Sequence, residues 1–464
     1  MQSREADKVS GYLRQPMLRM RWRKASCQLA GSLFVSEVPE KRMTMQKEVQ
    51  VDHDFSLAAV PQTERRGFWP MFVLMMGFTF FSASMWAGGT LGAGLSIGEF
   101  ALAVLGGNII LGVYTGLLAY ISTATGLSTH LLARYAFGEK GSRLASFMLA
   151  ITQVGWFGVG VAMFALPVQK ITGINVYLLI GAGGLLMITT AYWGIKALTI
   201  LSVIAVPSIA LLGTYSVATA VETAGGFQAL LQIEPAQRMP LAVALTICVG
   251  SFASGGTLTP DFTRFAKTKT IGVVTTVMAF FFGNSLMFAF GAIGAAVTGQ
   301  ADISEVMYLQ GLIVPAIIIL GLNIWTTNDN ALYASGLGFS NITGIPKCKI
   351  VLVNGVVGTL AALWLYNNFV GFLTFLGSTL PPIGGIIIAD YFLLRKGQYP
   401  ALETMRFAAV NWPAIAAWGA GVALAGFAPG IPPLNAVLGA AIVYVAIMLV
   451  TRPAAQSAAV QTER

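Results

Sequence analysis

The sequence has few charged residues, few cysteines and few histidines. Only 10% of its 464 residues are Asp, Glu, Lys or Arg, whereas a soluble domain carries roughly 25%. The three cysteines, Cys27, Cys248 and Cys348, are scattered, and no two have the spacing of a metal site or of a disulfide framework. The two histidines, His53 and His130, lie outside the long apolar segments. These shortages argue against a soluble domain and against a metal-centred enzyme.

Motifs of nucleotide-driven and hydrolytic machinery are also missing. The sequence contains no Gly-x4-Gly-Lys-Ser/Thr loop, which would cradle the phosphates of a nucleotide. It contains no Ser/His/Asp set and no carboxylate pair placed for hydrolysis. The sequence therefore predicts a protein that is not an enzyme and that needs no organic cofactor.

Long apolar runs make up most of the chain. Hydrophobic residues account for 56% of it, and about 20 apolar residues suffice for a helix to cross a bilayer. Because helices satisfy their own backbone groups in lipid, these runs predict an all-α polytopic membrane protein. Twelve transmembrane helices are predicted, at residues 68–92, 97–122, 143–168, 173–194, 197–220, 239–258, 270–298, 305–337, 350–366, 368–394, 408–427 and 431–451.

Positive charge is distributed unevenly between the predicted loops. Loops rich in Lys and Arg stay in the cytoplasm, so both termini are predicted to face the cytoplasm. The net charge of +9 follows from this bias and from a basic N-terminal segment, and it does not indicate a nucleic-acid partner. The predicted outer loops carry only Lys170 and Arg238, whereas the inner loops carry Arg134, Lys140, Arg143, Lys196, Arg264, Lys267, Lys269, Lys347, Lys349, Arg395, Lys396 and Arg406.

The two ends of the chain are polar. Residues 1–66 are basic and contain no spanning run, and the apolar stretch Gln28–Val35 is too short for a signal peptide. Either these residues form a disordered cytoplasmic tail, or translation starts at Met43 or Met45, which is the interpretation we favour. Residues 452–464 are predicted to be a cytoplasmic C-terminal tail.

One apolar motif occurs twice. SASMWAGGTL ends at Leu91, and GSFASGGTL ends at Leu258. A Gly-Gly pair holds helical geometry poorly, and broken helices in corresponding halves of a chain indicate the binding site of a secondary transporter. The alternative is that both motifs allow close packing of unbroken helices.

Charges are nearly absent from the middle of the spans. No Lys or Arg lies mid-span between Trp69 and Val450, and Asp329 is the clearest intramembrane acid, with Asp390 near one end of the tenth span. Intramembrane ionisable residues are functional candidates. Since no buried cation could receive an anion, and no run of acids could receive a cation, a neutral substrate is predicted.

The third span combines an amide with an aromatic ring. Gln153, Trp156 and Gly160 are spaced i, i+3 and i+7, so they share one helix face. Glutamine offers an acceptor and two donors that match the edge of a heterocycle, and tryptophan offers a surface for stacking. The alternative for Trp156 is a packing or lipid-facing role.

The eighth span is the most polar. Asn323, Thr326, Thr327 and Asn330 share one face, whereas Asn328 points to another side. Adjacent hydroxyls suit a hard monovalent cation, and carbonyls freed at a helix break could complete its shell. The alternative is interhelical hydrogen bonding. The density of polar residues favours a binding role.

Several segments together resemble the nucleobase:cation symporter-1 family, of the purine-cytosine permease type: SASMWAGGTLGAGLS, THLLARYAFG, TQVGWFGVGVAMF, LSVIAVP and GLNIWTTNDNALYASGLGF. The resemblance extends from about Arg66 to about Val450. It implies a leucine-transporter-like fold with a core at residues 67–395, in which two inverted repeats of five helices (about 67–220 and 238–395) carry broken first and sixth helices. The two helices within residues 396–451 would be peripheral.

The resemblance also implies the residues of the site. A planar base would lie between two aromatic rings, with amides and backbone groups at its polar edge, and a sodium ion would be held by hydroxyls and carbonyls. The substrate-binding residues would be Gln153, Trp156, Ser251, Phe252, Gly255, Asn323 and Asn328, and the sodium ligands would be Gly77, Phe81, Asn323, Thr326 and Thr327.

The function implied by the resemblance is import of cytosine by sodium symport with alternating access, without an obligatory protein partner. One alternative is coupling to protons, with Asp329 as the carrier. Another is a different substrate, such as uracil, a purine, a hydantoin or a hydroxymethylpyrimidine. A channel or a membrane sensor is a remote alternative, because the sequence shows no charged ring, no repeated polar pore face and no soluble signalling domain.

Overall fold

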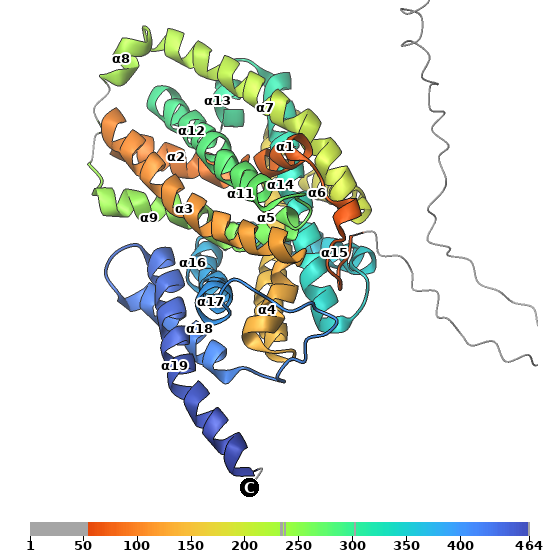
Figure 1. Ribbon diagram of the computed structural model, residues 1–464. Helices are drawn as coiled ribbons and strands as arrows, with labels where there is room; N and C mark the ends of the chain where they lie inside the picture. Colours follow the sequence, from red (N-terminus) through yellow and green to blue (C-terminus); the bar gives the residue numbers. More distant parts are fainter. Residues whose placement is uncertain (1–53, 233–234, 236–237, 301–302, 463–464) are drawn as a thin grey trace, which may run out of the picture. The chain divides into compact units, whose positions relative to one another are not determined.

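The regular elements of the described chain are helices. The computed structural model describes residues 54–462 except 233–234, 236–237 and 301–302. Within these ranges, the β pairing is limited to one parallel bridge between Arg66 and Ala266. The all-α class predicted from the apolar runs is confirmed (Figure 1).

Short connections join most of these helices. A 3-10 turn, η1 (Gln62–Glu64), precedes the first helix, and two π-helical segments, η2 (Ala279–Asn284) and η3 (Asp390–Leu394), continue α11 and α17. The α-helices are α1 (Phe68–Thr79), α2 (Ser82–Gly94), α3 (Ile97–Thr125), α4 (Thr129–Phe137), α5 (Gly141–Thr172), α6 (Val176–Trp193), α7 (Ile195–Thr223), α8 (Phe227–Leu231), α9 (Leu241–Gly256), α10 (Thr259–Thr263), α11 (Lys269–Met278), α12 (Ser285–Thr298), α13 (Ile303–Leu309), α14 (Ile313–Thr343), α15 (Lys347–Asn367), α16 (Phe369–Thr379), α17 (Pro381–Ala389), α18 (Trp412–Phe427) and α19 (Pro432–Thr462).

The helices follow the predicted spans closely. Within the described ranges, eight helices are long and apolar enough to cross a membrane, and the bent pair α1–α2 would make a ninth. Of the other predicted spans, 239–258 and 408–427 contain α9 and α18, whereas 305–337 extends from α13 across the non-helical residues 310–312 into α14. Since α9 and α18 have only 16 residues each, and α14 carries the polar stretch, twelve crossings stay a prediction. The inverted repeat stays a prediction as well.

The first span is broken, but not at its Gly-Gly-Thr-Leu motif. α1 and α2 meet at Phe80–Phe81, and their axes differ by 58°. The motif, residues 88–91, lies inside the continuous helix α2. A Cβ at Gly88 would overlap the backbone of Phe288 in α12. The glycine therefore permits close approach of two helices, and the predicted break at this motif is wrong.

The sixth span is broken at its copy of the motif, as predicted. α9 ends at Gly256 and α10 begins at Thr259, with Thr257 and Leu258 between them. The hydroxyl of Tyr114, on α3, is hydrogen-bonded to the Thr257 hydroxyl at 2.7 Å. The side chain of Tyr114 therefore binds a residue of the break from a neighbouring helix.

A further break, which the sequence analysis did not predict, divides the tenth span. α16 ends at Thr379 and α17 begins at Pro381. Proline cannot donate a backbone hydrogen bond and so interrupts a helix. The indole nitrogen of Trp418, in α18, donates to the Thr379 carbonyl at 2.9 Å, so this carbonyl has a partner outside its own helix.

The segment before α1 belongs to the folded part of the chain. Residues 1–53, with both candidate start positions, lie outside the described residues. Residues 54–66 pack on the helices: Val60 is buried, and the Arg66 amide donates to the Phe265 carbonyl at 2.6 Å. The assignment of these last thirteen residues to a disordered tail is therefore wrong.

Two groups of helices flank the site described below. In one group, α14 packs on α5, α6 and α15. In the other, α2 packs on α9 and α12, and α3 packs on α9 and α11. α19 packs on α18, α17 and α9, so the last two helices, predicted to be peripheral, contact the core.

Candidate functional site

A cavity of about 660 Å³ lies between the two groups of helices, a size typical of small-molecule sites. Its lining continues from the breaks along α2 to Thr90 and along α9 to Thr246, and reaches Pro432 and Pro433 at the start of α19. Beyond the second break it includes Phe262 of α10. Six of the seven predicted substrate residues line it, namely Gln153, Trp156, Ser251, Phe252, Gly255 and Asn328.

Aromatic rings form a continuous wall of the cavity. The ring of Phe81 lies edge-on to Trp156, with centroids 5.0 Å apart, and edge-on to Phe252, at 5.8 Å. Phe372 of α16 makes a similar contact with Trp156 at 5.6 Å. The predicted stacking pair, Trp156 and Phe252, therefore borders the same space, and the side chain of Phe81 lies between the two rings.

Gln153 presents a hydrogen-bond donor to this space. Its side chain is only 5% exposed, and its Nε2 has no hydrogen-bond partner among the described residues. A buried donor without a partner costs roughly 1–3 kcal/mol. Because Gln153 also lines the cavity, a ligand bound there is the candidate partner for this donor.

Asn328 presents the opposite polarity. Its Nδ2 donates to the Phe157 carbonyl at 3.1 Å and lies 3.2 Å from the sulfur of Met187. Its Oδ1 lies directly against Gly160, where a Cβ would overlap it. Since the amide hydrogens are engaged by α5 and α6, the oxygen is the group that Asn328 offers to the cavity.

Asn323 does not line the cavity. Its side chain is fully buried, and its Nδ2 donates to the carbonyl of Phe80 at 3.3 Å, at the break between α1 and α2. Its place at the edge of the substrate stays a prediction. Its side chain joins the eighth span to the first break.

Three of the oxygen groups predicted to hold sodium lie within one turn of α14, whose Asn323 side chain reaches that break. The hydroxyls of Thr326 and Thr327 each donate to the carbonyl of Asn323 at 3.0 Å. Gly77 lies in the last turn of α1, where carbonyls lack partners within their own helix, and Phe81 follows that helix. Within the described ranges, no group of three or more His, Cys, Asp or Glu residues could hold a metal, so a cation here would be held by neutral oxygens.

Asp329 faces away from the cavity. It is fully buried, and its Oδ1 accepts a hydrogen bond from the Thr190 hydroxyl of α6 at 2.8 Å. The same hydroxyl accepts from the indole nitrogen of Trp325 at 2.8 Å. The carboxyl therefore lies between α6 and α14, and it is absent from the described lining of the cavity.

Part of the lining was not predicted from the sequence. Leu376 of α16 and the proline pair Pro432–Pro433 border the cavity, although no motif marks them. Phe81 was predicted only for its carbonyl, whereas its ring also lines the cavity. Only the packing of distant helices brings these side chains to the site, so no local pattern could have revealed them.

Broken helices around a cavity of this size, among membrane-length apolar helices, define the class of protein as a membrane transporter. The chain belongs to the family of permeases for cytosine/purines, uracil, thiamine and allantoin, which it matches over residues 59–447. The family resemblance found in the sequence is confirmed. The prediction that the chain is a transporter and not an enzyme is confirmed as well.

Individual relatives are consistent with this family. The chain is 59% identical over 393 residues to the cytosine permease of Escherichia coli strain K12, which covers 85% of this chain and 94% of that protein. It is 24% identical over 364 residues to the hydantoin permease of Microbacterium maritypicum, covering 70% of this chain and 73% of that protein.

Solved structures share the fold. A nucleobase-cation-symport-1 family transporter, in a closed conformation with bromovinylhydantoin bound, has a TM-score of 0.75 at 22% identity, over 85% of this chain and 94% of that one. A Na+-coupled sialic acid symporter in a substrate-bound outward-open state has a TM-score of 0.65 at 14% identity, over 82% and 90% of the two chains.

Proposed function

We propose that this permease imports cytosine across the bacterial inner membrane, with both termini in the cytoplasm, and that a sodium gradient drives the import. The unpartnered Nε2 of Gln153, a residue that lines the cavity, is the observation that carries this proposal, because it calls for a ligand with a hydrogen-bond acceptor, and the aromatic rings beside it suit a planar one. The 59% identity to a cytosine permease supports the choice of ligand.

The polarity of the two amides matches one edge of cytosine. The Oδ1 of Asn328 can accept a hydrogen bond from the exocyclic amino group of the base. The Nε2 of Gln153 can donate to an acceptor on the ring, while Trp156 and Phe252 border its faces. Uracil carries a carbonyl where cytosine carries the amino group, so uracil would place two acceptors together at Asn328. We therefore expect the site to favour cytosine over uracil.

The proposed sodium site is connected to the substrate cavity through the first break. The hydroxyls of Thr326 and Thr327 donate to the carbonyl of Asn323, and the side chain of Asn323 binds the break beside Phe81. The ring of Phe81 in turn contacts Trp156. An ion that orders this break would thereby order one wall of the cavity. Coupling of this kind is reciprocal, so cytosine would tighten sodium binding to the same degree.

Proton coupling through Asp329 has less support. The carboxyl is buried between α6 and α14 and does not line the described cavity, whereas a carrier must exchange its proton with water on each side in turn. Thr326 and Thr327 lie one turn along α14 from Asn323, whose side chain binds the first break, and Thr327 lines the cavity.

Uptake of radiolabelled cytosine tests the function directly. Cells that lack their own carrier would express the full chain and be assayed with and without a sodium gradient at fixed pH. We expect sodium-driven uptake that excess unlabelled cytosine blocks and excess uracil does not. Uptake that is independent of sodium would rule out the proposed ion. Absence of cytosine uptake would contradict the proposed substrate, and purines, hydantoins and hydroxymethylpyrimidines would then be tested in its place.

Thr326→Ala and Trp156→Ala should separate the two roles. The threonine variant removes a proposed sodium ligand, so the sodium concentration for half-maximal uptake should rise by about tenfold, with a smaller change in cytosine affinity at saturating sodium. The tryptophan variant should mainly weaken cytosine binding, because base–aromatic stacking contributes about 1–3 kcal/mol. Thr343→Ala is the matched control, since Thr343 is an exposed residue of the same helix. Equal losses of both affinities in both variants would contradict this division.

A further inference from the structure

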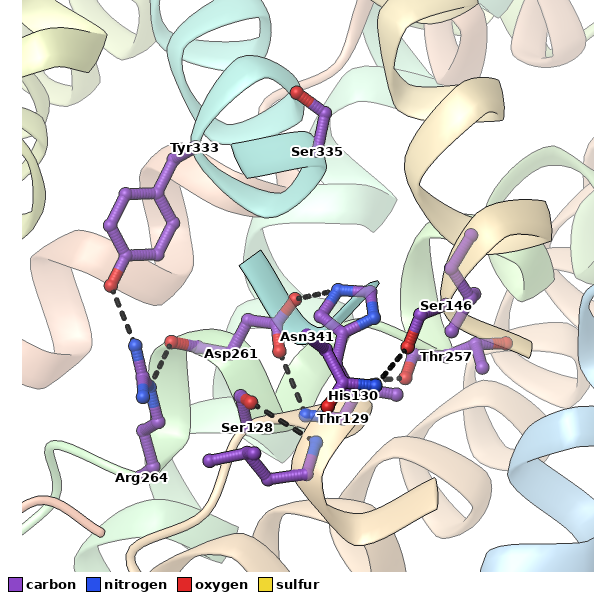
Figure 2. A network of polar contacts seen from close by, with 12 residues as sticks. Ser128, Thr129, His130, Ser146, Thr257, Asp261, Arg264, Tyr333, Ser335 and Asn341 are labelled. Atoms are coloured by element: carbon purple, nitrogen blue, oxygen red, sulfur yellow. Dashed lines mark hydrogen bonds and ion pairs between the residues drawn. The ribbon is translucent and has the colours of Figure 1, made fainter. Parts of the chain in front are cut away.

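A buried polar cluster lies next to the end of the cavity marked by Phe262. The ring of Phe262 lies 6.0 Å from that of Tyr333 on α14. Two residues beyond Phe262, Arg264 is fully buried. Its Nη2 donates to the Tyr333 hydroxyl at 3.0 Å, and its Nε donates to the Asp261 carbonyl at 3.2 Å (Figure 2). This cluster is at the end of the core that the loop charges predict to face the cytoplasm.

The segment before α1 completes the cluster. The Arg264 guanidinium donates to the carbonyls of Asp54 and Phe55, each at 2.8 Å. The Asp54 carboxylate forms an ion pair with Lys347 of α15 at 2.7 Å and accepts from the Ile195 amide at 3.2 Å. One short segment therefore connects α10 with α7 and α15.

A second set of contacts ties α10 to α4. The carboxylate of Asp261 accepts from the Thr129 amide at 2.8 Å, and its other oxygen lies 3.5 Å from Nε2 of His130 (Figure 2). Asp261 and His130 are both buried. Together with the Arg264–Tyr333 bond, these contacts join α10 to the two helices that face it.

These contacts obstruct one exit from the cavity. α10 continues the broken span whose other half, α9, lines the cavity with Ser251 and Phe252, and α14 lines it with Asn328. A solute that leaves past Phe262 must part α10 from α14, and the Arg264–Tyr333 bond spans that gap. Release in this direction therefore requires the cluster to break.

The chemistry of the cluster suits a reversible contact. Burying charges costs hydration energy, which their mutual attraction offsets only in part, so the closed and open arrangements can be close in free energy. The glycine contact between α2 and α12 is different, because it brings two backbones together without charged groups. Separating these helices would expose no charged group for water to stabilise, so we expect this contact to remain closed.

We propose that Arg264 and the segment Asp54–Ser56 form the gate that closes the cavity toward the predicted cytoplasmic end, and that the gate opens when this segment leaves Arg264 and Lys347. The proposal rests on the transport function proposed above. Its test needs no transported solute, so an error in the choice of substrate or ion would leave the test intact.

Thiol labelling from each side of the membrane tests the gate. Ala334 lines the cavity on α14, and Ala334→Cys would be introduced into a full-length chain whose three native cysteines are replaced by alanine. A membrane-impermeant maleimide would be applied to inside-out and right-side-out vesicles. Two gate variants follow: Asp54→Asn weakens the ion pair with Lys347, and Tyr333→Phe removes only the hydroxyl that Arg264 binds.

Both variants should shift labelling to the cytoplasmic side. We expect the ratio of the inside-out rate to the right-side-out rate to rise at least about fivefold, because each substitution destabilises the closed arrangement. Tyr444→Phe is the matched control, since it removes a hydroxyl that donates to Asp390 at 2.9 Å in a contact of η3 with α19, and it should leave the ratio unchanged. An unchanged ratio in both gate variants would overturn the proposal, and an unchanged ratio in Asp54→Asn alone would overturn the role of the segment. Intact folding would be checked by size-exclusion elution in detergent.

Discussion

Gly160→Ala is expected to reduce cytosine uptake by about 5- to 150-fold without reducing the amount of protein in the membrane. A Cβ at this position would overlap Oδ1 of Asn328 and would lie 2.7 Å from its Cγ and 2.8 Å from its Nδ2. The asparagine cannot simply withdraw, because its amide is bonded to the Phe157 carbonyl and lies against Met187. Losing a buried hydrogen-bond acceptor costs about 1–3 kcal/mol, which corresponds to about 5- to 150-fold in affinity.

The effect should be specific to this position. Gly181→Ala, on α6, introduces the same methyl group where no heavy atom lies within 4 Å, so uptake should remain normal. Binding of cytosine to purified protein, measured by calorimetry, separates lost affinity from slower transport. If Gly160→Ala bound and transported cytosine normally, Asn328 could not be the group that recognises the amino group of the base.

Gln153→Met is expected to weaken cytosine binding by about 10- to 100-fold while leaving the unliganded protein as stable as before, or more stable. Methionine has nearly the same length and fills the same space, but it has no amide to donate to the base. In the described protein, Nε2 has no partner, so its removal relieves an unsatisfied buried donor instead of breaking a bond. An unchanged or raised melting temperature together with lost affinity is the pattern expected of a residue kept for its ligand.

A neighbouring residue provides the control. Thr152→Val keeps the shape of a buried side chain whose hydroxyl donates to the Leu149 carbonyl of its own helix at 2.8 Å, and it should change cytosine affinity by less than about threefold. Thermal unfolding and equilibrium binding would be measured on the same detergent preparations. A lower melting temperature with normal cytosine affinity in Gln153→Met would show that Gln153 supports the fold and not the substrate.

Two copies of one motif show how far local sequence can be interpreted. Both Gly-Gly-Thr-Leu segments have the composition of a helix break, yet only residues 255–258 end a helix. Residues 88–91 lie within α2, and Gly88 lies against the backbone of Phe288 in α12. Low helix propensity permits a break without requiring one, because packing against a neighbouring helix can stabilise the helical conformation.

Two charged residues show the same limit of interpretation from local sequence. Arg264 and Lys347 were counted as loop charges that indicate membrane orientation, but both are buried. Their partner, Asp54, lies 210 residues before Arg264 in a segment whose composition resembles a tail. The polarity of a residue indicates that it needs hydration or hydrogen-bond partners. It does not indicate which groups, far away in the chain, can supply those partners in the folded protein.

The sequence by itself determined that this protein is an all-helical membrane permease, where most of its helices begin and end, and which helix faces carry amides and hydroxyls. Hydropathy and helical periodicity suffice for the helices and their faces, because both act over one or two turns of the chain, whereas the permease family came from the resemblance of several motifs. Only the tertiary structure decided that the first break lies at Phe80–Phe81, that the Asn323 amide binds this break, and that Phe81 lies between Trp156 and Phe252. Each of these depends on contacts between helices that are far apart in the chain, and the free energy of such contacts comes from the packing of the whole bundle.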